Sequence, residues 1–380
     1  MRGHRRKAAA ALAVASLAAS CGSTTASPAT ATRQVTAIPL SPATSLTAPS
    51  GATWATIPMG GTGPNLFWQL FTLPAGGSTW TLRTPPAIAT NGALILATAG
   101  QTLTAGIRPS LYLSFSPVTS TSDGGIQWTT SPPEPGLADV PDALAAAPGG
   151  QMIALDQDQH VSEATTATAA WNTMTSRTAV TATPSGRDCD LTALTAVAYT
   201  PARIPLLGGT CARPGTTGIF TSTAGTWNLA GPVLPAAFAG ARVQVLRLTN
   251  TGTGDTALLK AGNDLIAAWS PGDASKWTLS PALPLDGTSP MSASTSASGA
   301  TAVVLSGGRG EILGGTHDPW RPLPPLPAAR AITLAILPDG TAEALAADGA
   351  TLTIWQLATG PARWFKVQVI KVPIQYGSSS

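Results

Sequence analysis

Short runs of apolar and small residues, separated by glycine-containing turns, make up most of the chain after residue 50. The clearest example is the stretch 331–357, in which Pro338-Asp339-Gly340 and Ala347-Asp348-Gly349 divide three such runs. Runs of this length are typical of strands, and glycine supplies the positive φ that tight hairpins need. No window carries a sustained i, i+3, i+4, i+7 apolar stripe. The pattern therefore predicts an all-β fold with almost no helix.

Three stretches of the chain show the same order of runs and turns. The expected strands are Ala331–Leu337, Thr341–Ala346 and Ala350–Leu357; Met291–Ala297, Ala300–Leu305 and Glu311–Gly314; and Ala143–Ala147, Gln151–Leu155 and a strand from Gln159. The first run of the second and third stretches is poor in large side chains, which suits an innermost strand where neighbouring sheets crowd together. The stretches are therefore interpreted as copies of one structural unit.

Tryptophan recurs at a nearly constant interval through the same region. The series is Trp80, Trp128, Trp171, Trp227, Trp277, Trp320 and Trp364, with separations of 48, 43, 56, 50, 43 and 44 residues. A period of about 45 residues, with four strand-like runs per unit, is typical of a propeller blade. The expected fold is a seven-bladed β-propeller of four-stranded antiparallel blades over residues 52–376. Each tryptophan is expected to begin a short strand and to pack between blades, rather than to stack on carbohydrate.

The first blade is one strand short in this scheme. The missing strand is expected from Val35–Leu40 or from the C-terminal run Val367–Tyr376. Residues 377–380 are expected to form a disordered tail.

The turn before Trp128 carries a family resemblance. Residues 121–128, Thr-Ser-Asp-Gly-Gly-Ile-Gln-Trp, resemble the Asp-box of BNR and sialidase-type propellers, whose pattern is Ser or Thr, any residue, Asp, any, Gly, any, Thr, Trp. Thr121, Asp123, Gly125 and Trp128 match the pattern, and Gln127 replaces the family's threonine. In that family the box is a structural turn between the third and fourth strands of a blade, remote from any active site. The resemblance therefore implies a fold and no activity.

The N-terminus has the anatomy of an export signal. A basic head precedes the apolar stretch Ala8–Ala19, which is shorter than the roughly 20 residues that a membrane-spanning helix needs. Leu17-Ala18-Ala19-Ser20-Cys21-Gly22 resembles the bacterial lipobox, which implies removal of the signal peptide 1–20 and a lipid on Cys21. Cleavage by the ordinary signal peptidase, for example after Ala31, is the alternative and would release a secreted protein.

A segment dominated by Ser, Thr, Ala and Pro follows Cys21 up to residue 51. Such a segment buries too little apolar surface to offset the entropy of ordering, so it is expected to be a flexible tether. The domain would then be held at the outer face of the bacterial cytoplasmic membrane as a monomer.

Cysteine parity agrees with a lipid on Cys21. If Cys21 carries lipid, Cys189 and Cys211 remain as an even pair in an oxidising compartment, where a disulfide is expected. Two buried free thiols are the alternative. The histidines outside the signal, His160 and His317, do not fall at zinc-ligand spacing from either cysteine, so no metal site is expected.

The positive charge of the full chain belongs to its export signal. Without the basic head, 17 basic residues remain against 18 acidic ones. Nucleic-acid binding needs clustered Lys and Arg to displace counterions from phosphates, so it is not expected.

No catalytic arrangement stands out in the sequence. A sialidase would need three arginines, a tyrosine nucleophile with a glutamate, and an acidic aspartate, whereas the chain has three tyrosines and few glutamates. The alternating Asp156, Asp158 and His160 are interpreted as a polar hairpin turn rather than a metal site. The favoured function is a non-catalytic binding or scaffold module for a protein or cell-envelope glycan, without a cofactor. The alternative is a diverged sialidase-like glycoside hydrolase or lyase.

Overall fold

The computed structural model describes residues 44–61, 66–86, 93–108, 117–131, 137, 141–223, 225–296, 298–315, 317–358 and 362–373. All of them belong to the compact unit Ile38–Ser380. The expected signal peptide, Cys21, Val35–Leu40 and the tail 377–380 lie outside the described residues. Within those residues, no helix has the length and apolar character needed to cross a membrane.

Strands dominate the described chain and follow one another in consecutive antiparallel sets. The first set is β1 (Ser45–Thr47), β2 (Thr53–Gly60), β3 (Leu66–Leu73) and β4 (Thr81–Leu82), and the second is β5 (Ala93–Ala99), β6 (Thr102–Arg108), β7 (Val118–Thr121) and β8 (Thr129–Thr130). The third is β9 (Pro141–Ala146), β10 (Met152–Asp156), β11 (His160–Ala164) and β12 (Asn172–Ser176), and the fourth is β13 (Leu191–Tyr199), β14 (Pro205–Cys211), β15 (Gly218–Thr223) and β16 (Thr226–Leu229).

The later sets continue this order. The fifth is β17 (Val243–Asn250), β18 (Gly254–Ala261), β19 (Asp264–Pro271) and β20 (Thr278–Leu279), with β21 (Leu283–Pro284) also paired to β19. The sixth is β22 (Pro290–Thr295), β23 (Thr301–Leu305), β24 (Gly310–Leu313) and β25 (Arg321–Pro322), and the seventh is β26 (Ala331–Ile336), β27 (Ala342–Asp348), β28 (Thr351–Leu357) and β29 (Trp364–Lys371).

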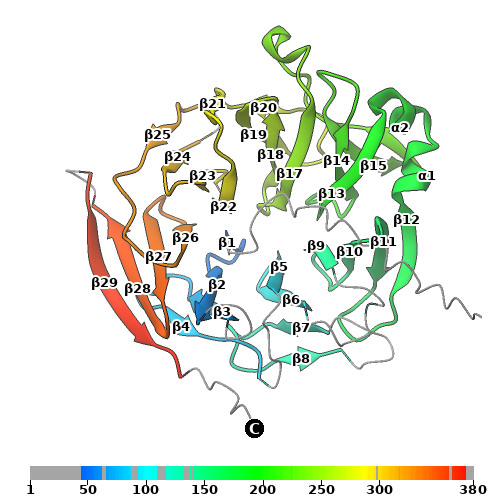
Figure 1. Ribbon diagram of the computed structural model, residues 1–380. Helices are drawn as coiled ribbons and strands as arrows, with labels where there is room; N and C mark the ends of the chain where they lie inside the picture. Colours follow the sequence, from blue (N-terminus) through cyan, green and yellow to red (C-terminus); the bar gives the residue numbers. More distant parts are fainter. Residues whose placement is uncertain are drawn as a thin grey trace, which may run out of the picture. The chain divides into compact units, whose positions relative to one another are not determined.

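Within Ile38–Ser380 these sets follow one another around a common centre, with the first strand of each set innermost and the last at the outside (Figure 1). Backbone pairing joins two pairs of sets. The parallel pairing of β1 with β22 links the first set to the sixth, and the ends of β14 and β17 link the fourth to the fifth. The predicted all-β class is confirmed, since strands make up nearly all of the regular structure.

The turns form where the sequence places glycine. Gly340 has a φ of +84°, its N–H donates to Leu337 O at 2.9 Å, and the N–H of Thr341 donates to Asp339 Oδ1 at 2.9 Å. A residue with a Cβ adopts this φ only with strain, which is why glycine ends the turn. The three stretches predicted from the pattern form β26–β28, β22–β24 and β9–β11, with ends shifted by one or two residues.

The core consists of apolar clusters that lie between neighbouring sets and link each set to the next around the ring. Each cluster contains one of the periodic tryptophans. The order starts with the cluster between the first and second sets and ends with the cluster between the seventh and first sets. The tryptophans in this order are Trp128, Trp171, Trp227, Trp277, Trp320, Trp364 and Trp80. A cluster therefore also joins the last set to the first, although the two are far apart in sequence.

Several of these tryptophans also bond to the preceding set. The indole N–H groups of Trp277, Trp320 and Trp364 donate to the carbonyl oxygens of Ala230, Pro281 and Pro324, which lie 47, 39 and 40 residues earlier in the chain. The distances are 2.6, 3.0 and 3.2 Å. A buried indole N–H usually needs such an acceptor. The tryptophans therefore fix the contact between one set and the next.

The seventh and first sets meet around Trp80. Its indole N–H donates to Glu343 Oε2 at 2.6 Å, and its backbone N–H donates to Gln368 Oε1 at 2.9 Å. Gln368 Nε2 donates back to Trp80 O at 2.8 Å. These side-chain bonds tie β27 and β29 to the segment before β4.

The first strand of the first set is not the one expected. It is β1, which lies inside the range 21–51 expected to be a tether, so the folded part begins before residue 52. Ser45 Oγ donates to Leu334 O at 2.6 Å and Thr47 Oγ1 donates to Ile336 O at 2.7 Å. The Ser/Thr-rich composition predicted a tether at this position. In the folded protein the short hydroxyl side chains fit the crowded centre and donate hydrogen bonds to its carbonyl groups, so the segment forms a strand. The C-terminal run expected as an alternative lies in β29 of the seventh set as far as Lys371.

A small helical insertion was not predicted from the apolar pattern. It consists of α1 (Arg177–Thr181) and α2 (Pro184–Cys189), and the 3₁₀ turn η2 (Ala236–Phe238) follows later in the chain. Ser176 and Thr183 cap the two helices, accepting from the N–H groups of Ala179 and Gly186. These hydroxyls satisfy N–H groups that a short helix leaves free. Each helix is too short to show an apolar stripe, so only its cap was visible in the sequence.

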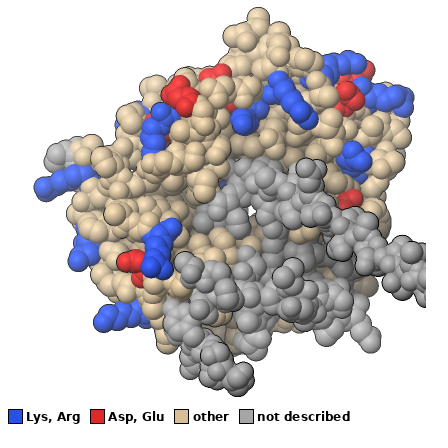
Figure 2. Space-filling view, in the orientation of Figure 1, with Lys and Arg blue, Asp and Glu red and all other residues tan. Residues whose placement is uncertain are grey.

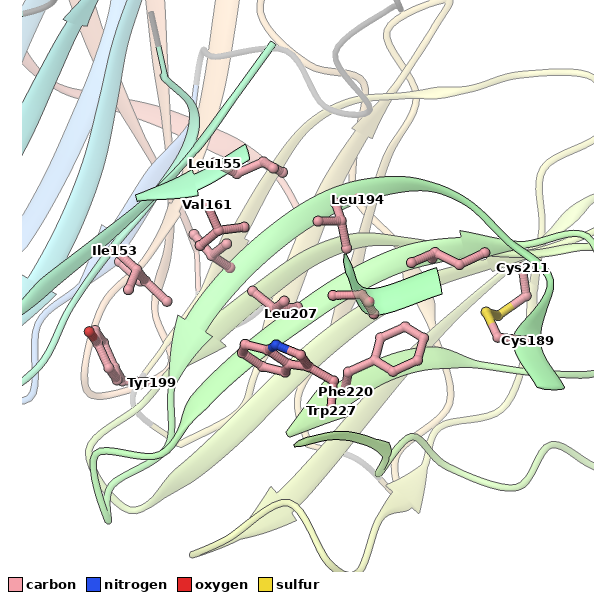
Figure 3. Close-up of a cluster of buried hydrophobic side chains, with 14 of the residues drawn as sticks. Ile153, Leu155, Val161, Cys189, Leu194, Tyr199, Leu207, Cys211, Phe220 and Trp227 are labelled. Atoms are coloured by element: carbon pink, nitrogen blue, oxygen red, sulfur yellow. A yellow bond between two sulfur atoms is a disulfide. The ribbon is translucent and has the colours of Figure 1, made fainter. Parts of the chain in front are cut away.

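The predicted disulfide is present between Cys189, at the end of α2, and Cys211, at the end of β14. The Cα atoms are 4.9 Å apart and both residues are fully buried. In Figure 3 the disulfide lies at one end of the apolar cluster between the third and fourth sets, and Tyr199 lies at the other. The covalent bond therefore attaches the helical insertion to the core of the fourth set.

Candidate functional site

A cavity lies at the centre of the ring. It has a volume of ≈ 140 Å³ and is lined by β1 and the adjoining Thr44 and by the first strands of the second, third, fourth and fifth sets. Most of its lining consists of Ala, Leu, Ile and Val side chains and the backbone of these strands. The small residues that the sequence places on the innermost strands therefore leave open space at the centre.

Arg247 and Asp142 are the charged residues of this lining. Arg247 Nη1 donates to Ala293 O at 2.6 Å, and Nη2 donates to Ser45 O at 3.3 Å. No carboxylate of the described residues forms an ion pair with Arg247, whereas Asp142 has an interaction partner of its own. The arginine thus bridges β22 and β1 through carbonyl groups, and no ion pair with a described residue compensates its charge.

Bulges in two neighbouring innermost strands shape the wall of the cavity. Val245 and Arg247 are opposite consecutive residues of β18, so Leu246 is an extra residue in β17. Thr195 is the extra residue in β13 in the same way, and its hydroxyl donates to Val245 O at 2.5 Å. A bulge turns side chains away from the regular alternation of a strand. The bulge at Leu246 directly precedes Arg247, which lines the cavity.

The environment of Arg247 opposes its charge. Burial lowers the pKa of Arg247 from its usual value to about 10, so the guanidinium stays protonated at neutral pH. A charge removed from water is costly unless other groups replace its solvation, and two carbonyl oxygens do so only in part. The side chain is therefore a charge that a ligand of opposite sign would stabilise.

Comparisons with known proteins bear on the fold. A 6-phosphogluconolactonase candidate from Bacteroides uniformis is 14% identical, with a TM-score of 0.51 over 84% of this chain and 97% of its own. A second such candidate, from Bacteroides fragilis, is 13% identical, with a TM-score of 0.51 over 86% and 96%. YCF48 from Cyanidioschyzon merolae is 13% identical, with a TM-score of 0.49 over 80% and 92%. No protein-family model and no curated protein matches the chain.

The chain has a β-propeller fold. At these identities the likeness concerns the fold alone, and the chemistry of the propeller must be argued from its own residues.

The turn that resembles an Asp-box lies between β7 and β8 at the outside of the propeller. Asp123 Oδ1 accepts from the N–H groups of Ile126 and Gln127 at 3.0 Å each, and from the hydroxyl of Thr121 at 2.8 Å. The Gln127 N–H, followed by the Thr121 hydroxyl, lowers the pKa of Asp123 below its usual value. Gly125 has a φ of +83°, and its N–H donates to Thr121 Oγ1 at 2.9 Å. The carboxylate therefore holds the turn together and is remote from the cavity lining.

Other residues singled out in the sequence also lie away from the cavity of the propeller. None of the seven periodic tryptophans and neither disulfide cysteine lines it. Asp156 Oδ1 accepts a hydrogen bond from the backbone N–H of His160 at 2.9 Å across the β10–β11 turn. Asp158 also has an interaction partner. Among the described residues no cluster of three His, Cys, Asp or Glu side chains could hold a metal ion. These features are accounted for by turns and packing.

Arg247 was not predicted as a site residue, although the sequence carries a signal for it. Residues 243–248 read Val-Gln-Val-Leu-Arg-Leu, so an arginine interrupts an apolar run in an expected inner strand. A charge at such a position is rare without a partner. Most of the visible surface in Figure 2 is neutral, with Lys and Arg side chains spread over the outer parts of the propeller. Arg247, which lines the central cavity, therefore differs in its setting from the charges visible in Figure 2.

Proposed function

We propose that the chain is a lipid-anchored, seven-bladed β-propeller at the cell surface, which acts as a non-catalytic binding or scaffold module for a protein or cell-envelope glycan. The central cavity with Arg247, which has no ion-pair partner in the part of the chain that the structure describes, is the observation that carries the proposal. Ligands of propellers and of other rigid scaffolds normally meet the loops and the axial opening, where side chains vary without loss of the fold.

The seven strand sets support the number of blades. Each set contains four antiparallel strands in chain order, and each pair of neighbouring sets has its own apolar cluster with a tryptophan. We assign one blade to each set. The Asp-box-like turn between β7 and β8 lies between the third and fourth strands of the second blade, the position that the BNR resemblance implies.

The anchor remains a proposal from the sequence. A lipid on Cys21, a tether up to Thr44 and attachment at the outer face of the bacterial cytoplasmic membrane would present the propeller as a monomer to the cell envelope. Incorporation of a palmitate analogue tests this step. Labelling of the natural chain and its loss in Cys21→Ser are the expected results, whereas an unlabelled, secreted chain would contradict the anchor.

The lining of the cavity favours binding over glycoside hydrolysis. Hydrolysis with retention or inversion needs two carboxyl groups that flank the scissile bond, about 5 to 10 Å apart. Among the described lining residues Asp142 is the one carboxylate. Tyr199 also contributes to the lining, but burial, and then the charge of Glu163, raises the pKa of its hydroxyl, which is the opposite of what a nucleophile needs.

Binding of envelope material to the purified full-length chain tests the proposed function. We would apply the chain to an array of envelope glycans and to purified envelope proteins, with Leu96→Trp as the variant that fills the cavity. Retention of a ligand by the natural chain, and its loss in the variant, are expected. Release of sugar products from the array would instead favour the diverged sialidase-like enzyme.

A further inference from the structure

The guanidinium of Arg247 has donors that the protein does not use. Arginine carries five N–H groups, and the two carbonyl bonds occupy one on Nη1 and one on Nη2. Arg247 is one of the residues that line the central cavity, so we infer that its remaining N–H groups can be reached from the cavity.

The size of the cavity restricts what can reach these donors. Its ≈ 140 Å³ is well below the roughly 300–1,000 Å³ of sites for drug-sized ligands. Its walls are mainly aliphatic, with a few threonines and Asn250. A whole sugar ring inside the cavity would lose the hydration of its hydroxyl groups without gaining enough hydrogen bonds in return, so a protein or glycan partner would place only a small terminal group there.

The charge and shape of the guanidinium define the group that fits. A carboxylate has two coplanar oxygens that match two neighbouring N–H groups of arginine. A phosphate dianion would bring more acceptors and a second negative charge into a cavity whose lining offers one cation. A carboxylate with a short hydrocarbon part would place its charge on Arg247 and its carbon atoms on the aliphatic wall.

We propose that the central cavity binds a small aliphatic monocarboxylate, with the carboxylate on the unused N–H groups of Arg247 and the hydrocarbon part against the side chains of β5, β9 and β13. The inference rests on the proposed function in taking this cavity as the binding site. It adds the chemical class of the ligand.

Calorimetric titration of the full-length chain with isovalerate tests the proposal. Isovaleramide, inorganic phosphate and glucuronate serve as comparison ligands, since they remove the charge, change its geometry or add hydroxyl groups. Isovalerate is expected to bind, with each comparison ligand at least tenfold weaker. Equal affinity for isovaleramide or glucuronate, tighter binding of phosphate, or no binding of isovalerate at millimolar concentration would overturn the proposal.

Two variants locate the ligand, and a third is the matched control. Arg247→Met should weaken isovalerate binding by roughly 10- to 100-fold, the range for a hydrogen bond to a charged group. Leu96→Trp fills the cavity, leaves Arg247 in place and should have an effect of at least this size. Arg242→Met changes an exposed arginine outside the lining and should have no effect. Full affinity in either cavity variant, when folded, would contradict the assignment.

The contact between isovalerate and Arg247 can also be measured by NMR in the natural chain, so this test does not require Arg247→Met to fold. In the natural chain with ¹⁵N-labelled arginine, isovalerate should shift one Nε–Hε resonance, and the shift should vanish in Leu96→Trp. A folded chain without that shift contradicts the proposal. If the chain binds an envelope protein or glycan but not isovalerate, the monocarboxylate proposal is refuted and the proposed function stands. If it binds isovalerate but no envelope protein or glycan, the proposed function is refuted and the monocarboxylate proposal stands.

Discussion

Asp255, in β18, is fully buried, and neither of its carboxylate oxygens has a hydrogen-bond partner among the described residues. Ser270 is opposite to it on β19, and its hydroxyl is equally buried and without a partner there. Burial, and to a smaller extent the charge of Asp273, raises the pKa of Asp255 from 3.8 to about 8. The side chain is therefore a neutral acid in the folded protein at neutral pH.

This pKa makes the stability of the protein depend on pH. Between pH 4 and 8 the folded state keeps a proton that the unfolded state releases, so the free energy of unfolding should fall as pH rises through that window. The contribution from Asp255 is on the order of a few kcal/mol. Urea unfolding at pH 5, 7 and 9 should show this decline, and Asp255→Asn should reduce it. Asp348→Asn, at an exposed ion pair with Arg330, is the control. An identical slope in Asp255→Asn would refute the assignment.

Gly208, in β14, lies where the fourth set packs closely against β17 of the fifth set, and the absence of a side chain allows this close approach. A Cβ atom there would lie 2.6 Å from Val245 Cγ1 and 3.1 Å from Ala196 Cβ. Gly208→Ala should therefore lower the free energy of unfolding by about 1–3 kcal/mol, the usual cost of overpacking. Gly240→Ala, which meets open space, is the matched control in the same unfolding measurement. Equal stability of the two variants would show that Val245 moves aside without cost.

The helical insertion is an element whose stability depends on a covalent link. Residues 189 and 211 are separated by 22 positions, and the disulfide limits the unfolded chain over that loop. Replacing both cysteines with alanine should cost about 3 kcal/mol on the chain-entropy model. Denaturant unfolding of the oxidised natural chain and of the double variant measures the loss. Reduction should bring the natural chain close to the variant; a persistent difference would implicate packing of the sulfur atoms instead.

The turns and strands that recur in every set could be predicted from the sequence, whereas elements that occur once, such as β1, could not. The turns at Gly340 and Gly349 and the strands beside them follow from local residue preferences, which act in every set. β1 depends instead on acceptors in β26, such as Leu334 O, which only the folded ring brings within reach. The arginine in the apolar run 243–248 could be seen in the sequence, but its acceptors could not be predicted, since they lie in β22 and β1. Local pattern carries no information about such distant partners.

For the whole molecule, closure of the ring between the seventh and first sets depends on Trp80. Burial raises the pKa of Glu343, and the hydrogen bond from Trp80 opposes that rise. Trp80→Phe removes the donor, so the pKa of Glu343 should rise further and its ionised form should become more costly. The free energy of unfolding should therefore fall by about 1–3 kcal/mol at pH 7.5 and by less at pH 4.5.

Trp320→Phe is the matched control for ring closure. Its indole donates to the neutral carbonyl of Pro281, so the loss of stability should be the same at both pH values. Chemical unfolding of both variants at pH 4.5 and 7.5 makes the comparison. A loss in Trp80→Phe that does not change with pH would mean that Glu343 is not the group that senses the indole.

The position of β1 has a mechanical consequence. Among the described residues the propeller begins with β1, whose three residues lie at the centre rather than at the outer edge. A pull on the chain before β1 would act first on β1, whose Leu46 side chain and preceding Thr44 form part of the cavity wall. If the protein is tethered and binds a ligand as proposed, tension from the N-terminal side and occupancy of the cavity would act on the same short strand, and the two would be coupled.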